Sequence, residues 1–407
     1  MAYFLINGGK TLSGEISVSG SKNAALPIIF ASFAMGGVSS VTNVPDISDV
    51  SVALGLLEEL GAVITRCGKT LVIDARSSVY KEPNEKLVKK IRASSYLIGA
   101  MLVRFGKAPI QAFGGCNFGT RPIDMHLYAA ERLGAKRDSD FVFAEKLCGN
   151  DIYFDKASVG ATINALIMAS GAHGVTRIYG YAREPHVFSL VRFLSTSGIK
   201  VCKTFEYIEV EGGAGIGGKI ALIPDMIEAG TYIALSLLLN SELLIKDSDP
   251  KHLSSFFSVL KKAGAEFKIN EDGIIPYGKI TAPIDIETRP YPGFPTDLQP
   301  LIAPLMAKFH GGTVTERVFR GRFAYLDELK AFGVKSENDG DMAKIYSSEI
   351  KCANAYAPDL RGGAALVLTA LSAEGESVIN NADLVFRGYE NFVEKIRSLG
   401  GKIERIT

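Results

Sequence analysis

The chain lacks the cysteine pattern of a disulfide-bonded or zinc-binding protein. Its cysteines stand at positions 67, 116, 148, 202 and 352, an odd number that is widely scattered and never spaced as CxxC. We therefore expect free thiols, no structural disulfide and no metal. His126 has no second ligand at a metal-binding spacing, so we expect it to be an ordinary hydrogen-bonded packing residue.

Long apolar runs and an excess of one charge are also missing. No stretch of about 18 apolar residues occurs, and the first residues, MAYFLINGGKTLSGE, lack a basic segment followed by an apolar one. We therefore expect a cytoplasmic chain without membrane insertion. Forty-five Lys and Arg against 44 Asp and Glu leave a formal charge of +1, which offers nucleic acid no basic footprint. Any anion must be bound by a local cluster of cations.

The sequence contains a repeat that indicates two α/β domains. The 407 residues exceed the ~250–300 at which one hydrophobic core usually stops growing. An amphipathic helical stretch, a glycine and a strand-like stretch recur with glycines at 61, 134, 198, 264, 333 and 400, which are 73, 64, 66, 69 and 67 residues apart. Glycine after a helix supplies the left-handed conformation that ends the last turn. Six units grouped three and three predict two similar domains.

Two segments have the composition of phosphate-binding loops. Lys22 and Asn23 follow Ser-Gly-Ser and precede the apolar AALPIIF, a helix-start pattern whose free N–H groups and dipole favour an anion. The glycine-rich EGGAGIGGK at 211–219 follows an alternating, strand-like stretch and contains no GK[ST] sequence. We expect an anion site at the first segment and a hairpin turn at the second.

Cys116 differs from the other cysteines in its surroundings. It lies in GGCNFGT, where the flanking glycines predict an accessible loop. An accessible thiol can react, whereas a structural cysteine is normally buried and inert, as we expect for the other four.

Nine segments resemble those of UDP-N-acetylglucosamine 1-carboxyvinyltransferases, a family of enolpyruvyl transferases, in family order along nearly the whole chain. They are SGSKNAALP (19–27), IRASSYLIG (91–99), FGGCNFGTRPIDMH (113–126), DKASVGAT (155–162), IPDMIEAGT (223–231), PGFPTDLQ (292–299), FRGRF (319–323), DLRGGAALVL (359–368) and FRGYE (386–390). Two departures concern fine specificity. The residue immediately before Arg387 is not acidic, and the catalytic loop carries Asn117, Phe118 and Thr120 where the family usually has smaller residues.

The resemblance implies an α/β fold of two inside-out α/β barrel domains, each of three repeated βαβαββ units, with the active site in the interdomain cleft. The chain would cross between the domains near Ser21 and Ile223. Residues 22–223 would form the catalytic-loop and uridine-binding domain. Residues 1–21 and 224–407 would form the second enolpyruvyl transferase domain.

The resemblance also implies a reaction that needs no cofactor. The enolpyruvyl group of phosphoenolpyruvate would move to the 3-hydroxyl of the sugar of UDP-N-acetylglucosamine with release of phosphate, the first committed step of peptidoglycan precursor synthesis. Cys116, the residue that fosfomycin would modify, would protonate the methylene carbon and form a covalent adduct. Asp297 would accept the hydroxyl proton. Without the resemblance, the position of Asp297 before LQPLIAPLM favours a helix cap.

The family's site residues carry over as follows. The catalytic set would be Cys116, Asp297, Lys22, Arg121 and Arg387. Lys22, Arg121 and Arg387 would hold phosphoenolpyruvate, with Arg322 and Arg361 near its carboxylate. Asn23 would add a polar contact, and Arg92 would serve the nucleotide sugar. Uridine would be bound by Arg121, Pro122, Ile123, Asp124, Met125, Lys156, Ala157, Ser158, Val159 and Val318.

Three other functions stay open. A paralogue could use another nucleotide or shikimate 3-phosphate, although the shikimate-pathway relative lacks the loop cysteine. A non-catalytic clamp around a duplex would need a basic inner surface. A thiol acyl-transfer enzyme would need a histidine paired with Cys116. The sequence does not reveal the oligomeric state.

Overall fold

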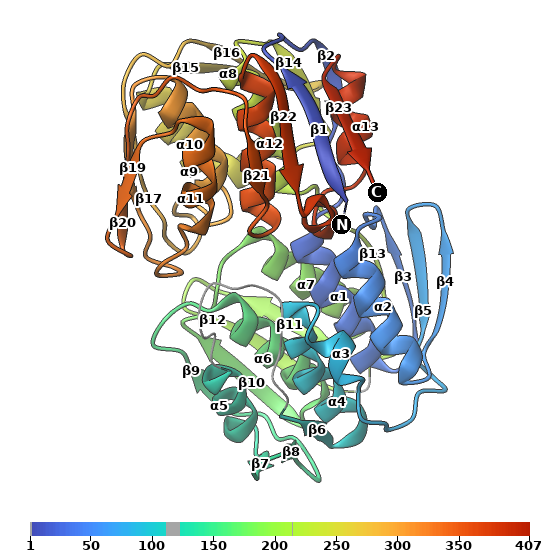
Figure 1. Cartoon of the computed structure of the whole chain (residues 1–407). Helices are drawn as coiled ribbons and strands as arrows, with labels where there is room; N and C mark the ends of the chain where they lie inside the picture. Colours follow the sequence, from blue (N-terminus) through green and yellow to red (C-terminus); the bar gives the residue numbers. More distant parts are fainter. Residues whose placement is uncertain (1, 111–122, 214) are drawn as a thin grey trace. The chain divides into compact units, whose positions relative to one another are not determined.

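The chain folds into two compact units, each of mixed α and β structure (Figure 1). The computed structural model describes residues 2–110, 123–213 and 215–407. The 20–223 unit comprises the described residues of Gly20–Ile223, and the 224–407 unit comprises Pro224–Thr407 together with the N-terminal segment up to Ser19. None of the helices in the described ranges combines the length and apolar composition needed to cross a membrane.

The 20–223 unit alternates helices and strands along the chain. Its elements are α1 (Lys22–Met35), β3 (Val38–Thr42), α2 (Ser48–Glu59), β4 (Val63–Cys67), β5 (Thr70–Asp74), α3 (Glu85–Val88), η1 (Arg92–Tyr96), α4 (Leu97–Phe105), β6 (Lys107–Pro109), α5 (Asp124–Arg132), β7 (Lys136–Arg137), β8 (Phe141–Phe143), β9 (Asp151–Tyr153), α6 (Val159–Gly171), β10 (Gly174–Tyr179), α7 (Pro185–Thr196), β11 (Lys200–Lys203), β12 (Tyr207–Gly212) and β13 (Lys219–Ala221).

The 224–407 unit includes two strands from the N-terminal segment. Its elements are β1 (Tyr3–Gly8), β2 (Gly14–Ser17), α8 (Met226–Leu238), β14 (Leu243–Lys246), η2 (Pro250–Leu253), α9 (Ser254–Lys262), β15 (Ala265–Asn270), β16 (Gly273–Gly278), β17 (Ile284–Glu287), α10 (Gln299–Lys308), β18 (Gly312–Thr315), α11 (Ala324–Leu329), η3 (Lys330–Phe332), β19 (Ser336–Asn338), β20 (Met342–Ile345), β21 (Asn354–Tyr356), α12 (Leu360–Ser372), β22 (Gly375–Asn380), η4 (Ala382–Arg387), α13 (Phe392–Ser398) and β23 (Lys402–Ile406).

The sheets of each unit share one pairing pattern. In the 224–407 unit the strand orders are β21-β22-β1-β23, β15-β16-β14-β2 and β17-β18-β20-β19, and each sheet has one parallel edge pair and two antiparallel pairs. In the 20–223 unit the sheets β11-β12-β10-β9 and β13-β3-β5-β4 repeat this pattern. The described part of the sheet β6-β8-β7 has two antiparallel pairs.

The long helices of each unit lie inside, and the sheets cover them (Figure 1). In α8 every residue after Met226 is buried, and in α12 all residues except the last are buried. A helix that is apolar on all sides is stable in water only when it is enclosed. The predicted inside-out α/β fold is therefore confirmed.

The glycines of the sequence repeat have the predicted backbone conformation. Gly61, Gly134, Gly198, Gly264, Gly333 and Gly400 all have positive φ, between 84° and 106°. A side chain is disfavoured in this left-handed region, so glycine ends these helices at little steric cost.

The predictions for the segment 211–219 and for the burial of four cysteines are wrong. The segment 211–219 is not a hairpin turn, because β12 ends at Gly212 and β13 pairs in parallel with β3 in another sheet. Cys67, Cys148, Cys202 and Cys352 are free, as expected, but exposed rather than buried. Cys67 and Cys202 lie on β4 and β11, the edge strands of sheets that cover the helices, and this position leaves their side chains in solvent.

His126 is a packing residue in the interior of the 20–223 unit, as predicted. It is 5% exposed on α5, and the Asn164 Nδ2 of α6 lies 2.6 Å from its Nδ1. Asn164 Nδ2 also donates to the carbonyl of Ser95, and its Oδ1 accepts from the N–H of Gly99. Burial, followed by the positive charge of Arg92, lowers the pKa of His126 from 6.5 to about 4. The ring is thus neutral in the folded protein at pH 7.

The lowered pKa of His126 predicts a loss of stability in mild acid. Between pH 6.5 and 4 the unfolded chain binds a proton at this ring that the folded chain does not bind. The contribution of His126 to the free energy of unfolding is therefore complete above pH 6.5 and is lost as the pH falls towards 4. Urea unfolding at pH 7 and 5 should show a smaller pH dependence for His126→Asn than for the wild type. The exposed His310→Asn serves as the control, and an unchanged dependence in His126→Asn would contradict the assignment.

Candidate active site

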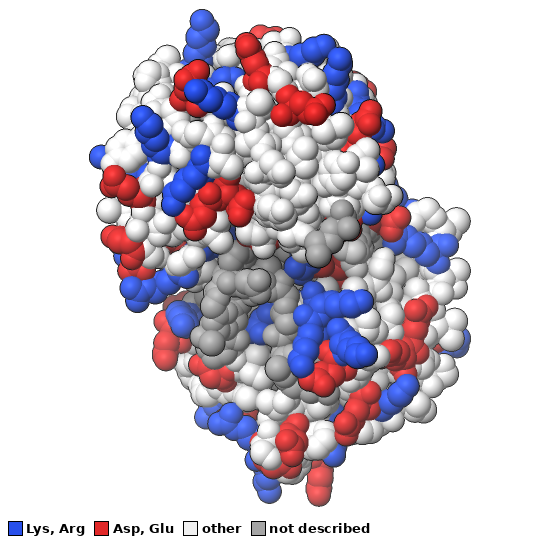
Figure 2. Space-filling model, viewed as in Figure 1, with Lys and Arg blue, Asp and Glu red and all other residues white. Residues whose placement is uncertain are grey.

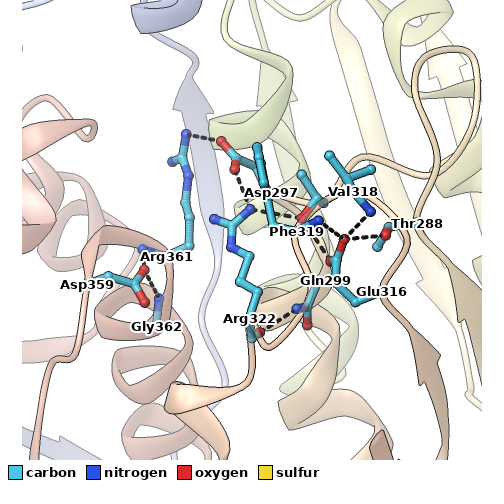
Figure 3. A network of polar contacts seen from close by, with 11 residues as sticks. Thr288, Asp297, Gln299, Glu316, Val318, Phe319, Arg322, Asp359, Arg361 and Gly362 are labelled. Carbon is cyan, nitrogen blue, oxygen red and sulfur yellow. Dashed lines mark hydrogen bonds and ion pairs between the residues drawn. The ribbon is translucent and has the colours of Figure 1, made fainter. Parts of the chain in front are cut away.

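The centre of the candidate site in the 224–407 unit is one carboxylate shared by two arginines (Figure 3). Arg322 Nη1 donates to Asp297 Oδ1 at 2.8 Å, and Arg361 Nη2 donates to Asp297 Oδ2 at 3.4 Å. The side chains of Arg322 and Arg361 are 4% and 2% exposed, whereas that of Asp297 is 29% exposed. Asp297 is therefore the common partner of two buried cations, and the charge of Asp225 also acts on Arg361.

Asp297 does not cap the helix that follows it. Helix α10 begins at Gln299, its N-cap is Leu298, and no side chain bonds at that cap. The alternative that local sequence favoured for Asp297 is therefore wrong. Its oxygens instead accept from arginines that lie 25 and 64 residues further along the chain.

Arg361 is held at the start of the buried helix α12. Asp359 is the N-cap, and its Oδ1 accepts from the backbone N–H groups of Arg361 and Gly362 at 2.8 and 3.0 Å. The guanidinium carbon lies 5.1 Å from the centre of the Tyr389 ring. Burial lowers the pKa of Arg361, but Tyr389 and Asp297 more than compensate, so its pKa is above the ordinary value.

Part of the Arg361 guanidinium has no partner among the described residues. Its Nε and Nη1 are buried and make no hydrogen bond there. A buried donor without a partner costs roughly 1–3 kcal/mol, and a charged donor costs more. This arrangement suits an anionic ligand that would supply the missing acceptors.

Arg322 is fixed by its backbone as well as by its side chain. Gln299 Nε2 donates to the Arg322 carbonyl at 2.9 Å, and Tyr325 Oη donates to Gln299 Oε1 at 2.6 Å. Gln299 opens α10 and Tyr325 lies on α11, so two helices hold the segment that carries this arginine.

In the 20–223 unit, Lys22 begins α1 as predicted. Its Nζ lies 2.8 Å from Asp49 Oδ2, and Asp49 is 3% exposed in the first turn of α2. The first turn of α1 contains no acidic residue, so the positive end of this helix dipole is not neutralised from within. Asp49 does not stand out in the sequence, because acidic residues are common in the first turn of a helix and carry no functional signal there.

The expected nucleotide-binding residues gather at two helix starts of the same unit. Asp124 and Met125 open α5 after Ile123, while Lys156, Ala157 and Ser158 lead into α6, which begins at Val159 and packs against α5. Arg92 begins η1 and is partly buried, which lowers its pKa. Its charge acts on the pKa of His126 in α5, so Arg92 lies near this group.

Three further residues of the predicted set lie among the described residues. Asn23 follows Lys22 in α1, Val318 precedes Arg322 in the loop after β18, and Arg387 is the last residue of η4. Phe386, which stands where the family usually has an acid, packs edge-on against Phe4 with ring centres 5.7 Å apart. The predictions for Cys116, Arg121 and Pro122 lie outside the described residues.

Figure 2 shows the charged groups on one face of the described part of the chain. Lys and Arg are interspersed with Asp and Glu on the face shown in Figure 2, as the formal charge of +1 leads one to expect. Across the described ranges, no group of three or more His, Cys, Asp or Glu side chains is arranged to hold a metal ion.

Comparison with known proteins relates the whole chain to enolpyruvyl transferases. The family model of EPSP synthase (3-phosphoshikimate 1-carboxyvinyltransferase) matches residues 6–396. UDP-N-acetylglucosamine 1-carboxyvinyltransferase of Halothermothrix orenii is 40% identical and covers 100% of both chains. The enzyme of the same name from Buchnera aphidicola is 39% identical over 98% of this chain and 99% of the relative.

Solved structures agree with this relationship. The enolpyruvyl transferase NikO from Streptomyces tendae has a TM-score of 0.89 at 26% identity, over 100% of this chain and 99% of that chain. EPSP synthase from Acinetobacter baumannii has a TM-score of 0.71 at 17% identity over 100% of both chains, which shows the fold alone. The resemblance seen in the sequence is confirmed, and the chain belongs to the enolpyruvyl transferases, in the family of the UDP-N-acetylglucosamine 1-carboxyvinyltransferases.

Proposed function

We propose that the protein transfers the enolpyruvyl group of phosphoenolpyruvate to the 3-hydroxyl of the sugar of UDP-N-acetylglucosamine and releases phosphate. The observation that carries this proposal is the pair of buried arginines, Arg322 and Arg361, that share the single carboxylate of Asp297. A small metabolite with a carboxylate and a phosphate matches such a site, since guanidinium groups donate paired hydrogen bonds to these anions. Relatives that bear the enzyme's name over their full length support the same substrates.

Asp297 is the proposed acceptor of the proton from the 3-hydroxyl. It is more exposed than the two arginines that hold it, so a substrate hydroxyl can reach its carboxylate. The arginine contacts fix the orientation of the carboxylate, which general base catalysis requires.

The remaining cations would bind the anionic groups of the substrates. Lys22, oriented by Asp49 at the start of α1, would bind the phosphate of phosphoenolpyruvate together with Arg121 and Arg387. Arg322 and Arg361 would bind its carboxylate.

The 20–223 unit would carry the catalytic loop and bind the nucleotide. Uridine would lie at the starts of α5 and α6, of which α6 is capped by the Ser158 side chain, and Arg92 would bind the nucleotide sugar. The 224–407 unit would be the second enolpyruvyl transferase domain. We also infer a cytoplasmic enzyme of peptidoglycan precursor synthesis.

The proposed reaction is an addition followed by an elimination. The sugar oxygen bonds to C2 of phosphoenolpyruvate, Asp297 takes the hydroxyl proton, and Cys116 gives a proton to C3. The tetrahedral intermediate carries the phosphate and a methyl group. Loss of one methyl proton and of inorganic phosphate then restores the double bond, so no oxidant or cofactor is needed.

The first test measures phosphate release from phosphoenolpyruvate. Release should require UDP-N-acetylglucosamine, and shikimate 3-phosphate should not replace it.

The same assay tests Asp297. Because Asp297→Asn keeps the shape of the side chain but cannot take a proton, its kcat should fall roughly 10²- to 10⁴-fold. Equal release with shikimate 3-phosphate, or an Asp297→Asn variant with wild-type kcat, would refute the proposal.

The second test concerns Cys116 and must allow for the four exposed thiols. Iodoacetate can reach these other cysteines, so the experiment uses a variant in which Cys67, Cys148, Cys202 and Cys352 are serine. In that background, iodoacetate or fosfomycin should modify Cys116 and abolish phosphate release. Cys116→Asp should stay active and resist alkylation, whereas Cys116→Ser should be much weaker because a hydroxyl is a poor acid. Full activity after modification of Cys116 would count against its role.

A further inference from the structure

Glu316 is a buried carboxylate in the 224–407 unit, and in Figure 3 it lies on the opposite side of Arg322 from Arg361. It is 1% exposed, and its Oε1 accepts from Thr288 Oγ1 at 2.6 Å and from the backbone N–H groups of Val318 and Phe319 at 2.8 and 2.9 Å. Its Oε2 accepts from Thr296 Oγ1 at 2.8 Å. These four donors hold the Glu316 carboxylate in one position, since a buried charge is tolerated only when it is hydrogen-bonded.

Thr296 connects Glu316 to Arg322. Its Oγ1 donates its single proton to Glu316, because an ionised carboxylate can only accept. The same oxygen accepts from Arg322 Nη1 at 3.0 Å, because a guanidinium can only donate. The direction of both hydrogen bonds is therefore set by the chemistry of the three groups.

Glu316 also holds the backbone of the loop that carries Arg322. Val318 and Phe319 belong to the short segment between Glu316 and Arg322, and their N–H groups bind Glu316 Oε1. Glu316 thus holds both the loop that carries Arg322 and the hydroxyl that contacts its guanidinium. Thr296 also directly precedes Asp297, which binds the same Nη1 at 2.8 Å.

We propose that Thr296 and Glu316 are positioning residues that fix the Arg322 guanidinium in the orientation needed to bind the carboxylate of phosphoenolpyruvate. This inference rests on the proposed function and adds two residues to its site. A guanidinium binds a carboxylate through two parallel hydrogen bonds, so its plane must be correctly turned. A side chain that is held before binding loses less conformational freedom when the ligand arrives. The Thr296 hydroxyl therefore contributes to phosphoenolpyruvate affinity without touching the ligand.

The test compares two substitutions at one position. Thr296→Val keeps the shape of the side chain and removes the hydroxyl, while Thr296→Ser keeps the hydroxyl and removes only the methyl group. We expect the Kd and KM for phosphoenolpyruvate to rise on the order of tenfold in Thr296→Val. Thr296→Ser should stay within about twofold of the wild type, and the KM for UDP-N-acetylglucosamine should change little in either variant.

Thr288→Val is the matched control for a purely structural effect. It removes the other threonine donor to Glu316, but the described contacts of Thr288 include none to Arg322. This variant should lower the thermal unfolding midpoint without a specific rise in the Kd for phosphoenolpyruvate. If Thr296→Val does not fold, Thr296→Ala takes its place with the same expected result.

Phosphoenolpyruvate binding tests the positioning role, and phosphate release tests the proposed function. Phosphoenolpyruvate that binds equally to Thr296→Val and the wild type would overturn the positioning role. The same conclusion would follow if Thr296→Ser were as impaired as Thr296→Val, because the hydroxyl would then not be the important group. A wild type that binds phosphoenolpyruvate but releases no phosphate with UDP-N-acetylglucosamine would instead overturn the proposed function and leave the positioning role standing.

Discussion

The candidate site depends on one electrostatic constraint: two buried guanidinium groups share one carboxylate. Arg322 and Arg361 are almost fully covered, and each donates a hydrogen bond to Asp297. Buried charge is costly, so the surrounding structure must hold it in place. Asp359 does this for the backbone of Arg361, and Gln299 does it for the backbone of Arg322. The buried Nε and Nη1 of Arg361, which make no hydrogen bond among the described residues, fit a site for an anionic ligand.

The two units hold their candidate ligand-binding cations in different ways. Lys22 pairs with the buried Asp49, whose Oδ2 lies 2.8 Å from its Nζ. Arg361 retains buried N–H groups without partners in the described structure. The inside-out fold makes both arrangements possible, because the N-termini of the enclosed helices α1 and α12 present Lys22 and Arg361 on rigid, buried supports. The functional groups thus depend on the same helices that form the hydrophobic cores.

Local features were predictable from the sequence, whereas long-range ones were not. The start of α1 at Lys22 and the positive φ of Gly264 follow from the chemistry of a few adjacent residues. The partner of β13 and the exposure of Cys202 depend on which strands pair and which face meets solvent, and adjacent residues do not encode this. The arginine partners of Asp297, and the role of Glu316 as a hydrogen-bond centre, likewise required the folded chain. Family resemblance supplied the arginines, but not their common partner.

The most direct test of this account measures thermal unfolding of the wild type and of Arg361→Met with and without phosphoenolpyruvate. A ligand that binds the folded state raises its unfolding midpoint, so the shift caused by phosphoenolpyruvate reports binding whatever the stability of the free protein. Phosphoenolpyruvate should raise the midpoint of the wild type, whereas Arg361→Met, which lacks one of the two guanidinium groups, should gain little from the ligand. An equal ligand-induced shift in both proteins would contradict the claim that the buried arginine pair binds the substrate anion.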